Sequence, residues 1–166
     1  VTGIAGRMQF IQAGQPFKVV VDYAHEPMSL TALFTALKTL VGKDRRVIGV
    51  VGSDGGGRDK GKRAEMGRIA GMLCDKVVIT DVNCYDEDPA EIAEMLAVGA
   101  REAGKKDGVD LFVVLDRRAG IKKAFELAKV GDAVAITAKG TEPFIAVAGG
   151  KTIPWDDAMV ARELVT

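Results

Sequence analysis

The chain has 166 residues, 48% of them hydrophobic, so it is long enough for one well-buried domain and too short to indicate two. Its formal net charge is zero at pH 7, which argues against a general binder of nucleic acid or of acidic membranes, because both need a basic excess over one face. No apolar run approaches the ~20 residues of a membrane span, so the sequence predicts a cytoplasmic protein without a membrane partner.

Apolar runs alternate with helical patterns along the chain. Five runs are predicted to be strands: residues 17–21, 47–51, 76–80, 111–115 and 133–137. The segments between them carry apolar residues at helical spacing, in stripes that begin at Leu30, Met66, Ile92 and Ile121. Asp88 and Asp116 are expected to cap the two later helices, with Pro89 at a first helical position.

The end of the chain has a different pattern. Residues 144–147 and 151–153 flank Gly149-Gly150, which predicts a hairpin with a two-residue turn, and a last helix is expected from about Asp156. Because continuously apolar strands are typical of sheets covered on both faces, the expected fold class is α/β. We predict a Rossmann-like, doubly wound, mostly parallel sheet of about six strands, with helices on both faces and an antiparallel C-terminal edge hairpin.

Cys74 and Cys84 are too few for a disulfide framework and lack the paired spacing of a zinc site, so we expect free thiols and no metal site. The sequence does not begin with Met, which predicts that Val1 lies within a longer protein. Residues 1–166 are interpreted as a single domain of it.

A glycine-rich segment, residues 52–63, joins a predicted strand to a predicted helix. Its glycines allow close approach of the backbone to a ligand, and its basic residues and the following helix N-terminus predict an anionic ligand. Gly56 and Gly61-Lys62 have P-loop spacing, but Arg63 stands where that motif needs Ser or Thr, so a P-loop is disfavoured. A solvated basic helix start that binds nothing stays the alternative.

Other polar residues follow the strands, at the edge where ligands bind in such sheets. His25, the only histidine, has no partner for a metal site and is interpreted as a ligand contact or a helix cap. Asp22 either binds a ribose hydroxyl or caps a turn. The G-x-G-x-x-G fingerprint is absent, which disfavours a nicotinamide dehydrogenase. Taken alone, residues 139–142 read as an ordinary loop.

Taken together, seven motifs resemble those of one family. They are Gly6-Arg7-Met8, Val21 to Pro27, Gly57 to Arg63, Glu87-Asp88-Pro89, Asp116-Arg117-Arg118, Ala138 to Glu142 and Ile153 to Asp157. In content and order they resemble the C-terminal domain of a Mur ligase, most closely the UDP-N-acetylmuramoyl-dipeptide ligases, or tripeptide synthetases, of peptidoglycan biosynthesis. The resemblance runs from about Gly6 to Leu164 and implies a Rossmann-like fold with an antiparallel edge.

The resemblance implies ATP-dependent amide formation. In this family ATP phosphorylates a substrate carboxylate, an amino group attacks the acyl phosphate, and phosphate leaves. The family's P-loop, Mg²⁺ ligands and carbamylated lysine lie in a central domain that this chain lacks, so ATP and Mg²⁺ would be bound mainly there. The chain would be the mobile domain that brings in the amino acid, and alone it should not turn over.

The resemblance also implies roles for individual residues. Arg7 and Asp22 would contact the nucleotide, with His25 in the same motif, and Arg58 would hold the carboxylate of the incoming amino acid. The residues that would read the amino acid's side chain are Val82, Asn83, Cys84, Tyr85, Ala138 and Glu142, with Glu142 on its distal amino group. Lys60 and Lys139 are further expected contacts to an anion.

Two departures from the family pattern bear on the substrate. Members that use meso-diaminopimelate carry Asp-Asn-Pro-Arg where this chain has residues 82–85, so the arginine for the distal carboxylate is replaced by Tyr85. They also carry Gly-Lys-Gly-His-Glu where this chain has residues 138–142. Losing a charge-assisted pair costs roughly 1.5–3 kcal/mol, so lysine or ornithine is favoured over meso-diaminopimelate. A neutral amino acid, or one that contacts the Tyr85 ring, stays open.

Two alternatives remain at this stage. A ligase that polymerises amino acids, as in cyanophycin synthesis, or adds glutamate to folate would share residues 22–25, although Gly6-Arg7-Met8 and the loop 58–63 favour the muramyl branch. The second alternative is a degenerate domain that binds a nucleotide or a partner without ligation.

Overall fold

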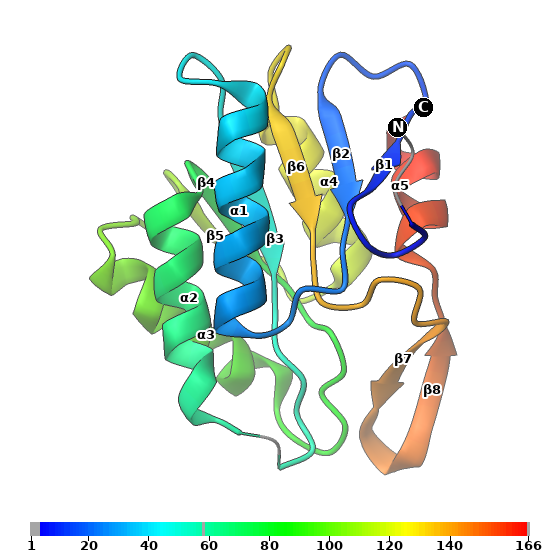
Figure 1. Cartoon of the computed structure of the whole chain (residues 1–166). Coiled ribbons are helices and arrows are strands. Elements are labelled where there is room, and N and C mark those ends of the chain that lie inside the picture. Colours follow the sequence, from blue (N-terminus) through cyan, green and yellow to red (C-terminus); the bar gives the residue numbers. More distant parts are fainter. Residues whose placement is uncertain (1–3, 58, 166) are drawn as a thin grey trace.

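The computed structural model describes residues 4–57 and 59–165, and its centre is a six-stranded sheet (Figure 1). In sheet order the strands are β1 (Gln9–Ile11), β2 (Lys18–Val21), β6 (Ala133–Ile136), β3 (Val47–Val51), β4 (Lys76–Ile79) and β5 (Leu111–Val113). All neighbours pair in parallel except β1, which is antiparallel to β2. The predicted mostly parallel sheet is confirmed.

Helices cover both faces of this sheet. α1 (Pro27–Val41), α2 (Gly61–Leu73) and α3 (Pro89–Glu102) pack on one face, and α4 (Arg117–Leu127) and α5 (Asp157–Val165) on the other (Figure 1). Successive residues of a strand point to opposite faces, so Val20 joins the first core while Val19 and Val21 join the second. The strands are continuously apolar because both of their faces are buried.

None of the described helices combines the length and apolarity that a membrane crossing requires.

The C-terminal hairpin is present but differs from the prediction in two respects. β7 (Phe144–Val147) and β8 (Lys151–Pro154) pair antiparallel as a sheet of their own, and the antiparallel edge of the main sheet is β1 instead. The turn is also longer than two residues, because residues 148–150 connect the strands. Gly149 and Gly150 have φ angles of +76° and +68°, which glycine adopts without strain.

The two predicted aspartate caps are confirmed. Asp88 accepts a hydrogen bond from the Ala90 N–H at 2.9 Å, and Asp116 accepts one from the Ala119 N–H at 2.8 Å. The caps fix where α3 and α4 begin, and thus where the loops that follow β4 and β5 end.

Glycines bring α2 and α3 into backbone contact. A Cβ atom at Gly67 would overlap the carbonyl group of Leu96, and one at Gly99 would overlap that of Ala64. Because interiors are close-packed, such a contact leaves no freedom for α2 to shift. It thereby fixes the helix start to which the glycine-rich loop leads.

Candidate functional site

Loops from distant parts of the sequence meet at the carboxyl end of the parallel strands, the lower end of the sheet in Figure 1. One pocket there, of about 220 Å³, is lined by Ala5, Gly6, Arg7, Tyr23 and Thr141. A Cβ atom at Gly6 would lie 2.8 Å from the Thr141 nitrogen, and one at Gly140 would lie 3.0 Å from the Tyr23 Cβ. Both glycines have positive φ angles, so the contact depends on them. Three of the predicted motifs are thus brought together.

Asp22 ties the first of these motifs to the end of β2. Its Oδ2 accepts the Met8 N–H and its Oδ1 accepts the Ala24 N–H, each at 2.8 Å. The carboxylate therefore caps a turn, which is one of the two roles considered from the sequence. The contact to a nucleotide stays a prediction.

His25 lies in the turn that follows β2. Its Nδ1 is 2.9 Å from the Tyr23 carbonyl oxygen, and its ring meets the Tyr23 ring edge-on at 4.7 Å between centroids. The N-cap of α1 is Glu26, so His25 does not cap the helix. A ligand contact is the role that stays predicted for His25.

Arg63, at the end of the glycine-rich loop, is buried and paired within the chain. Arg63 is 1% exposed, and its Nη2 donates to the Asp54 carbonyl oxygen at 2.9 Å and to Glu87 Oε2 at 2.8 Å. Glu87 Oε1 accepts the Gly57 N–H at 3.1 Å, and chiefly the Arg63 hydrogen bond holds the pKa of Glu87 below its usual value. Arg63 and Glu87 are therefore a scaffold under the loop.

The remaining cations of the loop differ in exposure. Lys62 Nζ donates to Glu26 Oε1 at 2.7 Å, which joins the starts of α2 and α1. Lys60 Nζ is 3.7 Å from Glu87 Oε1 and 58% of its side chain is exposed, so its contact to an anion stays a prediction. Arg58, the predicted ligand of the amino acid's carboxylate, lies outside the described residues.

Asn83 is the centre of a buried polar network. Its Nδ2 donates to Asp54 Oδ1 at 2.9 Å and to Glu142 Oε1 at 2.6 Å. Its Oδ1 accepts from Lys139 Nζ at 3.0 Å and from the Ala146 N–H at 2.8 Å. All four hydrogen-bonding positions of the amide are therefore used. The network joins the loops after β3, β4 and β6 to the hairpin strand β7.

Lys139 is fully buried in this network. Its ammonium donates to Glu142 Oε1 at 2.8 Å, Asn83 Oδ1 at 3.0 Å and the Val82 carbonyl oxygen at 3.3 Å. Burial lowers the pKa of Lys139, and the bond to Glu142 opposes that shift. All three ammonium hydrogens are used here, so the predicted contact to an external anion would require one of these bonds to break.

The loop after β4 presents a tyrosine where the family pattern has an arginine. Tyr85 has a φ angle of +52°, donates its N–H to the Ala146 carbonyl oxygen at 3.3 Å and packs its ring on Gly56, whose Cβ would lie 3.0 Å from the ring. Cys84 is buried, and burial, followed by the nearby Asp81, raises the pKa of its thiol. Val82 and Ala138 are also buried, at 1% and 6% exposure.

Sequence reasoning missed the structural role of two motifs. Arg117 donates from Nε and Nη2 to the two carboxylate oxygens of Asp157, each at 2.8 Å, and also from Nη2 to the Thr137 carbonyl oxygen at 2.7 Å. Arg117 and Asp157 are 2% and 0% exposed. The only signal in the sequence was that both lie in motifs of the resemblance, which carried no indication that they pair.

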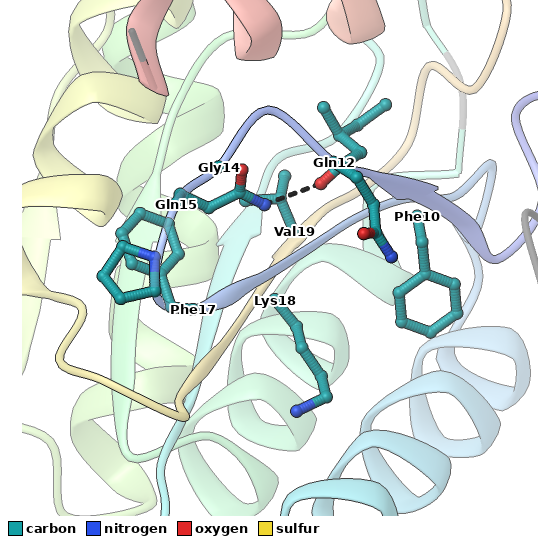
Figure 2. A pocket seen from close by; sticks show the side chains of 9 residues that line it. Phe10, Gln12, Gly14, Gln15, Phe17, Lys18 and Val19 are labelled. Carbon is teal, nitrogen blue, oxygen red and sulfur yellow. Dashed lines mark hydrogen bonds between the residues drawn. The ribbon is translucent and has the colours of Figure 1, made fainter.

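A second pocket, of about 310 Å³, lies in the loop between β1 and β2 (Figure 2). In it Gln15 Nε2 donates to the Ile11 carbonyl oxygen at 2.6 Å. This loop precedes β2, so it lies at the end of the sheet opposite the motifs, and it contains none of the predicted site residues. The candidate site is therefore the carboxyl rim. Within residues 4–57 and 59–165, no group of three or more His, Cys, Asp or Glu side chains is arranged to hold a metal ion.

Comparison with known proteins agrees with this geometry. Residues 6–140 match the family model described as "Mur ligase, glutamate ligase domain". The chain belongs to this Mur ligase family. It is 43% identical over 163 residues to a UDP-N-acetylmuramyl-tripeptide synthetase of Treponema denticola. The aligned region covers 98% of the chain and 30% of that protein.

Two further relatives of this Mur ligase domain are named for diaminopimelate. A UDP-N-acetylmuramoyl-L-alanyl-D-glutamate–2,6-diaminopimelate ligase of Alkaliphilus metalliredigens is 40% identical over 165 residues, 99% of the chain and 32% of that protein. A solved structure of a ligase with the same name superposes with a TM-score of 0.82 at 33% identity, over 99% of the chain and 32% of that structure. The chain thus spans about a third of the length of these relatives.

Proposed function

We propose that this chain is the C-terminal, amino-acid-binding domain of an ATP-dependent ligase that adds the third amino acid to UDP-N-acetylmuramoyl-dipeptide in the cytoplasm. The observation that carries the proposal is the meeting of the Mur ligase motifs at one rim, together with 43% identity to a tripeptide synthetase over nearly the whole chain. That identity favours the muramyl branch over the folate and cyanophycin alternatives.

The rim offers a surface suited to a nucleotide. Arg7 is exposed beside the 220 Å³ pocket and forms no ion pair with the described residues, so its guanidinium is available to phosphate oxygens. Tyr23 lines the same pocket, and the His25 ring meets the Tyr23 ring edge-on, so the two residues offer aromatic surface. ATP, with Mg²⁺, would supply the phosphoryl group that turns the carboxylate oxygen into a good leaving group. In this proposal the chain binds and orients, and the chemistry needs the rest of the ligase.

The amino-acid subsite favours a ligand with a distal ammonium. Asp54 and Glu142 both accept hydrogen bonds from Asn83, and Asp81 lies close enough to interact with Asp54, Lys139 and Arg117. Arg117 is paired with Asp157, so these three carboxyl groups face the single ammonium of Lys139 and leave an excess of negative charge. Burial raises the pKa of Asp81, which weakens but does not remove this excess of negative charge. Glu142 Oε2 receives no hydrogen bond from the described residues, and 23% of the side chain is exposed. We therefore propose lysine or ornithine as the substrate, in preference to meso-diaminopimelate.

The test is phosphate release by the full-length ligase with ATP, Mg²⁺ and UDP-N-acetylmuramoyl-dipeptide, one amino acid at a time. We expect lysine or ornithine to support release, with kcat/KM for meso-diaminopimelate roughly 10-fold to 150-fold lower because its distal carboxylate lacks an arginine partner. A preference for meso-diaminopimelate would contradict the substrate proposal. A protein that binds ATP but releases no phosphate with any amino acid would favour the degenerate binding domain.

A further inference from the structure

We infer that Lys139 is a positioning residue of the amino-acid subsite, which holds Glu142 so that one carboxylate oxygen is used internally and the other is presented to the ligand. The inference rests on the proposed function, because the ligand in question is the amino acid's distal ammonium. It assigns Lys139 a role different from the anion contact expected from the sequence.

The geometry separates the two oxygens of Glu142. Oε1 accepts from Lys139 Nζ at 2.8 Å and from Asn83 Nδ2 at 2.6 Å, whereas Oε2 accepts from none of the described residues. The Lys139 side chain is 0% exposed while that of Glu142 is 23% exposed, so Glu142 is the member of the pair that reaches solvent. An incoming ammonium therefore finds Oε2, and Oε1 is already shared by two donors.

Glu142 has little else to fix it. It lies in the loop between β6 and β7, next to the exposed residues Thr141 and Pro143, and its N–H donates to the Lys139 carbonyl oxygen at 2.9 Å. Its side chain has three rotatable bonds, each with several staggered states. Without the two donors on Oε1, the carboxylate would sample these states in water. Lys139 and Asn83 thus restrict it before the ligand arrives.

Lys139 is itself held in place. Asn83 Oδ1 and the Val82 carbonyl oxygen accept its other two hydrogens, and Asn83 is anchored by the Ala146 N–H of β7. A buried ammonium that lost these partners would pay a large desolvation cost, which keeps it in this position. A chain of hydrogen bonds thus connects the hairpin to Asn83, Asn83 to Lys139, and Lys139 to Glu142.

The test is a double-mutant cycle in the full-length ligase with Lys139→Met and Glu142→Gln, measuring KM for lysine, KM for ATP and kcat. We expect Lys139→Met to raise KM for lysine about 10-fold or more, with kcat and KM for ATP changed less than about threefold. Because Lys139 acts through Glu142, the double variant should be no worse than the worse single variant. Lys151→Met, at an exposed lysine of β8, is the matched control and should change nothing.

Two outcomes of the cycle would overturn the inference. An increase in KM for ATP or a large fall in kcat, with KM for lysine unchanged, would make Lys139 an anion contact. Effects of the two substitutions that multiply in the double variant would make Lys139 and Glu142 independent. A wild-type ligase that shows no release dependent on lysine or ornithine is a different result, because it removes the proposed substrate itself and with it this role of Lys139.

A measurement on the wild-type protein covers the case in which Lys139→Met does not fold. In protein labelled with ¹⁵N at lysine Nζ and ¹³C at the glutamate carboxyl groups, Lys139 should give an ammonium signal protected from exchange. On addition of lysine, the carboxyl signal of Glu142 should shift while the Lys139 signal stays protected. Loss of that protection on ligand binding would show that Lys139 leaves Glu142, which contradicts a positioning role.

Discussion

At the scale of single residues, the charged groups of this Mur ligase domain divide by burial rather than by motif. Arg63, Arg117 and Lys139 lie in three different motifs of the rim, yet all are nearly inaccessible and paired with carboxylates of the same chain. Such pairs are costly to bury and still more costly to break, so they specify how loops meet. Arg7 and Lys60 are exposed instead, which suits the ligand contacts proposed for them.

The ion pair between Arg117 and Asp157 gives a direct test of this division. Arg117→Met should lower the free energy of unfolding by about 3–5 kcal/mol, because it leaves the Asp157 carboxylate buried without its partner. The adjacent Arg118 forms an exposed pair with Glu163 at 2.7 Å, and Arg118→Met should cost at most about 1 kcal/mol. Urea unfolding of both variants measures the two losses in free energy of unfolding. Equal losses would contradict the difference that we assign to the buried and the exposed ion pair.

Asp132 provides a prediction for pH. Burial acts to raise its pKa, but hydrogen bonds from the Lys129 and Arg46 N–H groups and from the Arg46 guanidinium outweigh burial and hold the pKa below its usual value. A carboxylate with a lowered pKa stabilises the fold above its ordinary pKa, and this contribution is lost as the pH falls through the folded value. Acid should therefore remove it.

The comparison uses Asp132→Asn and urea unfolding at about pH 7 and about pH 3. The wild type should be more stable than the variant at the higher pH, and the gap should narrow at the lower pH. Asp44→Asn, at an exposed aspartate whose carboxylate accepts no hydrogen bond within the described residues, should show no such change of gap. A gap that stays constant between the two pH values would refute the assignment to Asp132.

At the scale of elements, the contact between α2 and α3 controls the position of the glycine-rich loop. Gly67→Ala should destabilise the domain by about 3 kcal/mol or more, because the new methyl group overlaps the backbone of Leu96 and neither helix can yield. Gly61→Ala in the same helix meets only the flexible Asp59 carboxylate at 3.2 Å and should be tolerated. Thermal unfolding of both variants measures the two changes in stability. A Gly67→Ala variant as stable as the wild type would contradict the close contact between the helices.

Elements with a strong local pattern were predictable, and those that depend on distant partners were not. The strand at residues 47–51 and the Asp88 and Asp116 caps are local features, and the structure confirms them. β1 has only three residues and is held by its pairing with β2, so it is too short for a periodic pattern to predict it. The separation of the hairpin from the main sheet also depends on long-range pairing.

The same reason limited prediction of the site. The motifs indicated which loops would meet at the rim, because carboxyl ends of parallel strands share one edge. They did not indicate that Lys139 is buried against Asn83, a contact across 56 positions, since lysine is rarely buried unless paired and its partner was unknown. Sequence reasoning therefore predicted which loops meet at the rim, but it could not separate the proposed ligand contacts from the internal supports.

At the scale of the whole molecule, the proposed function places ligand binding in this domain and the chemistry in the rest of the ligase. We therefore expect the 166-residue chain to bind its ligands but not to catalyse the reaction. Arg63 stands where a P-loop would have its Mg²⁺ hydroxyl, and it is hydrogen-bonded to Glu87, so this position does not supply the Mg²⁺ ligand that a P-loop uses in phosphoryl transfer. The chain with ATP, Mg²⁺, UDP-N-acetylmuramoyl-dipeptide and lysine should release no phosphate, whereas the full-length ligase should. As a control, circular dichroism of the isolated chain should show that it is folded under the assay conditions. Release by the folded chain alone would place catalytic groups at this rim and overturn its assignment as a binding domain.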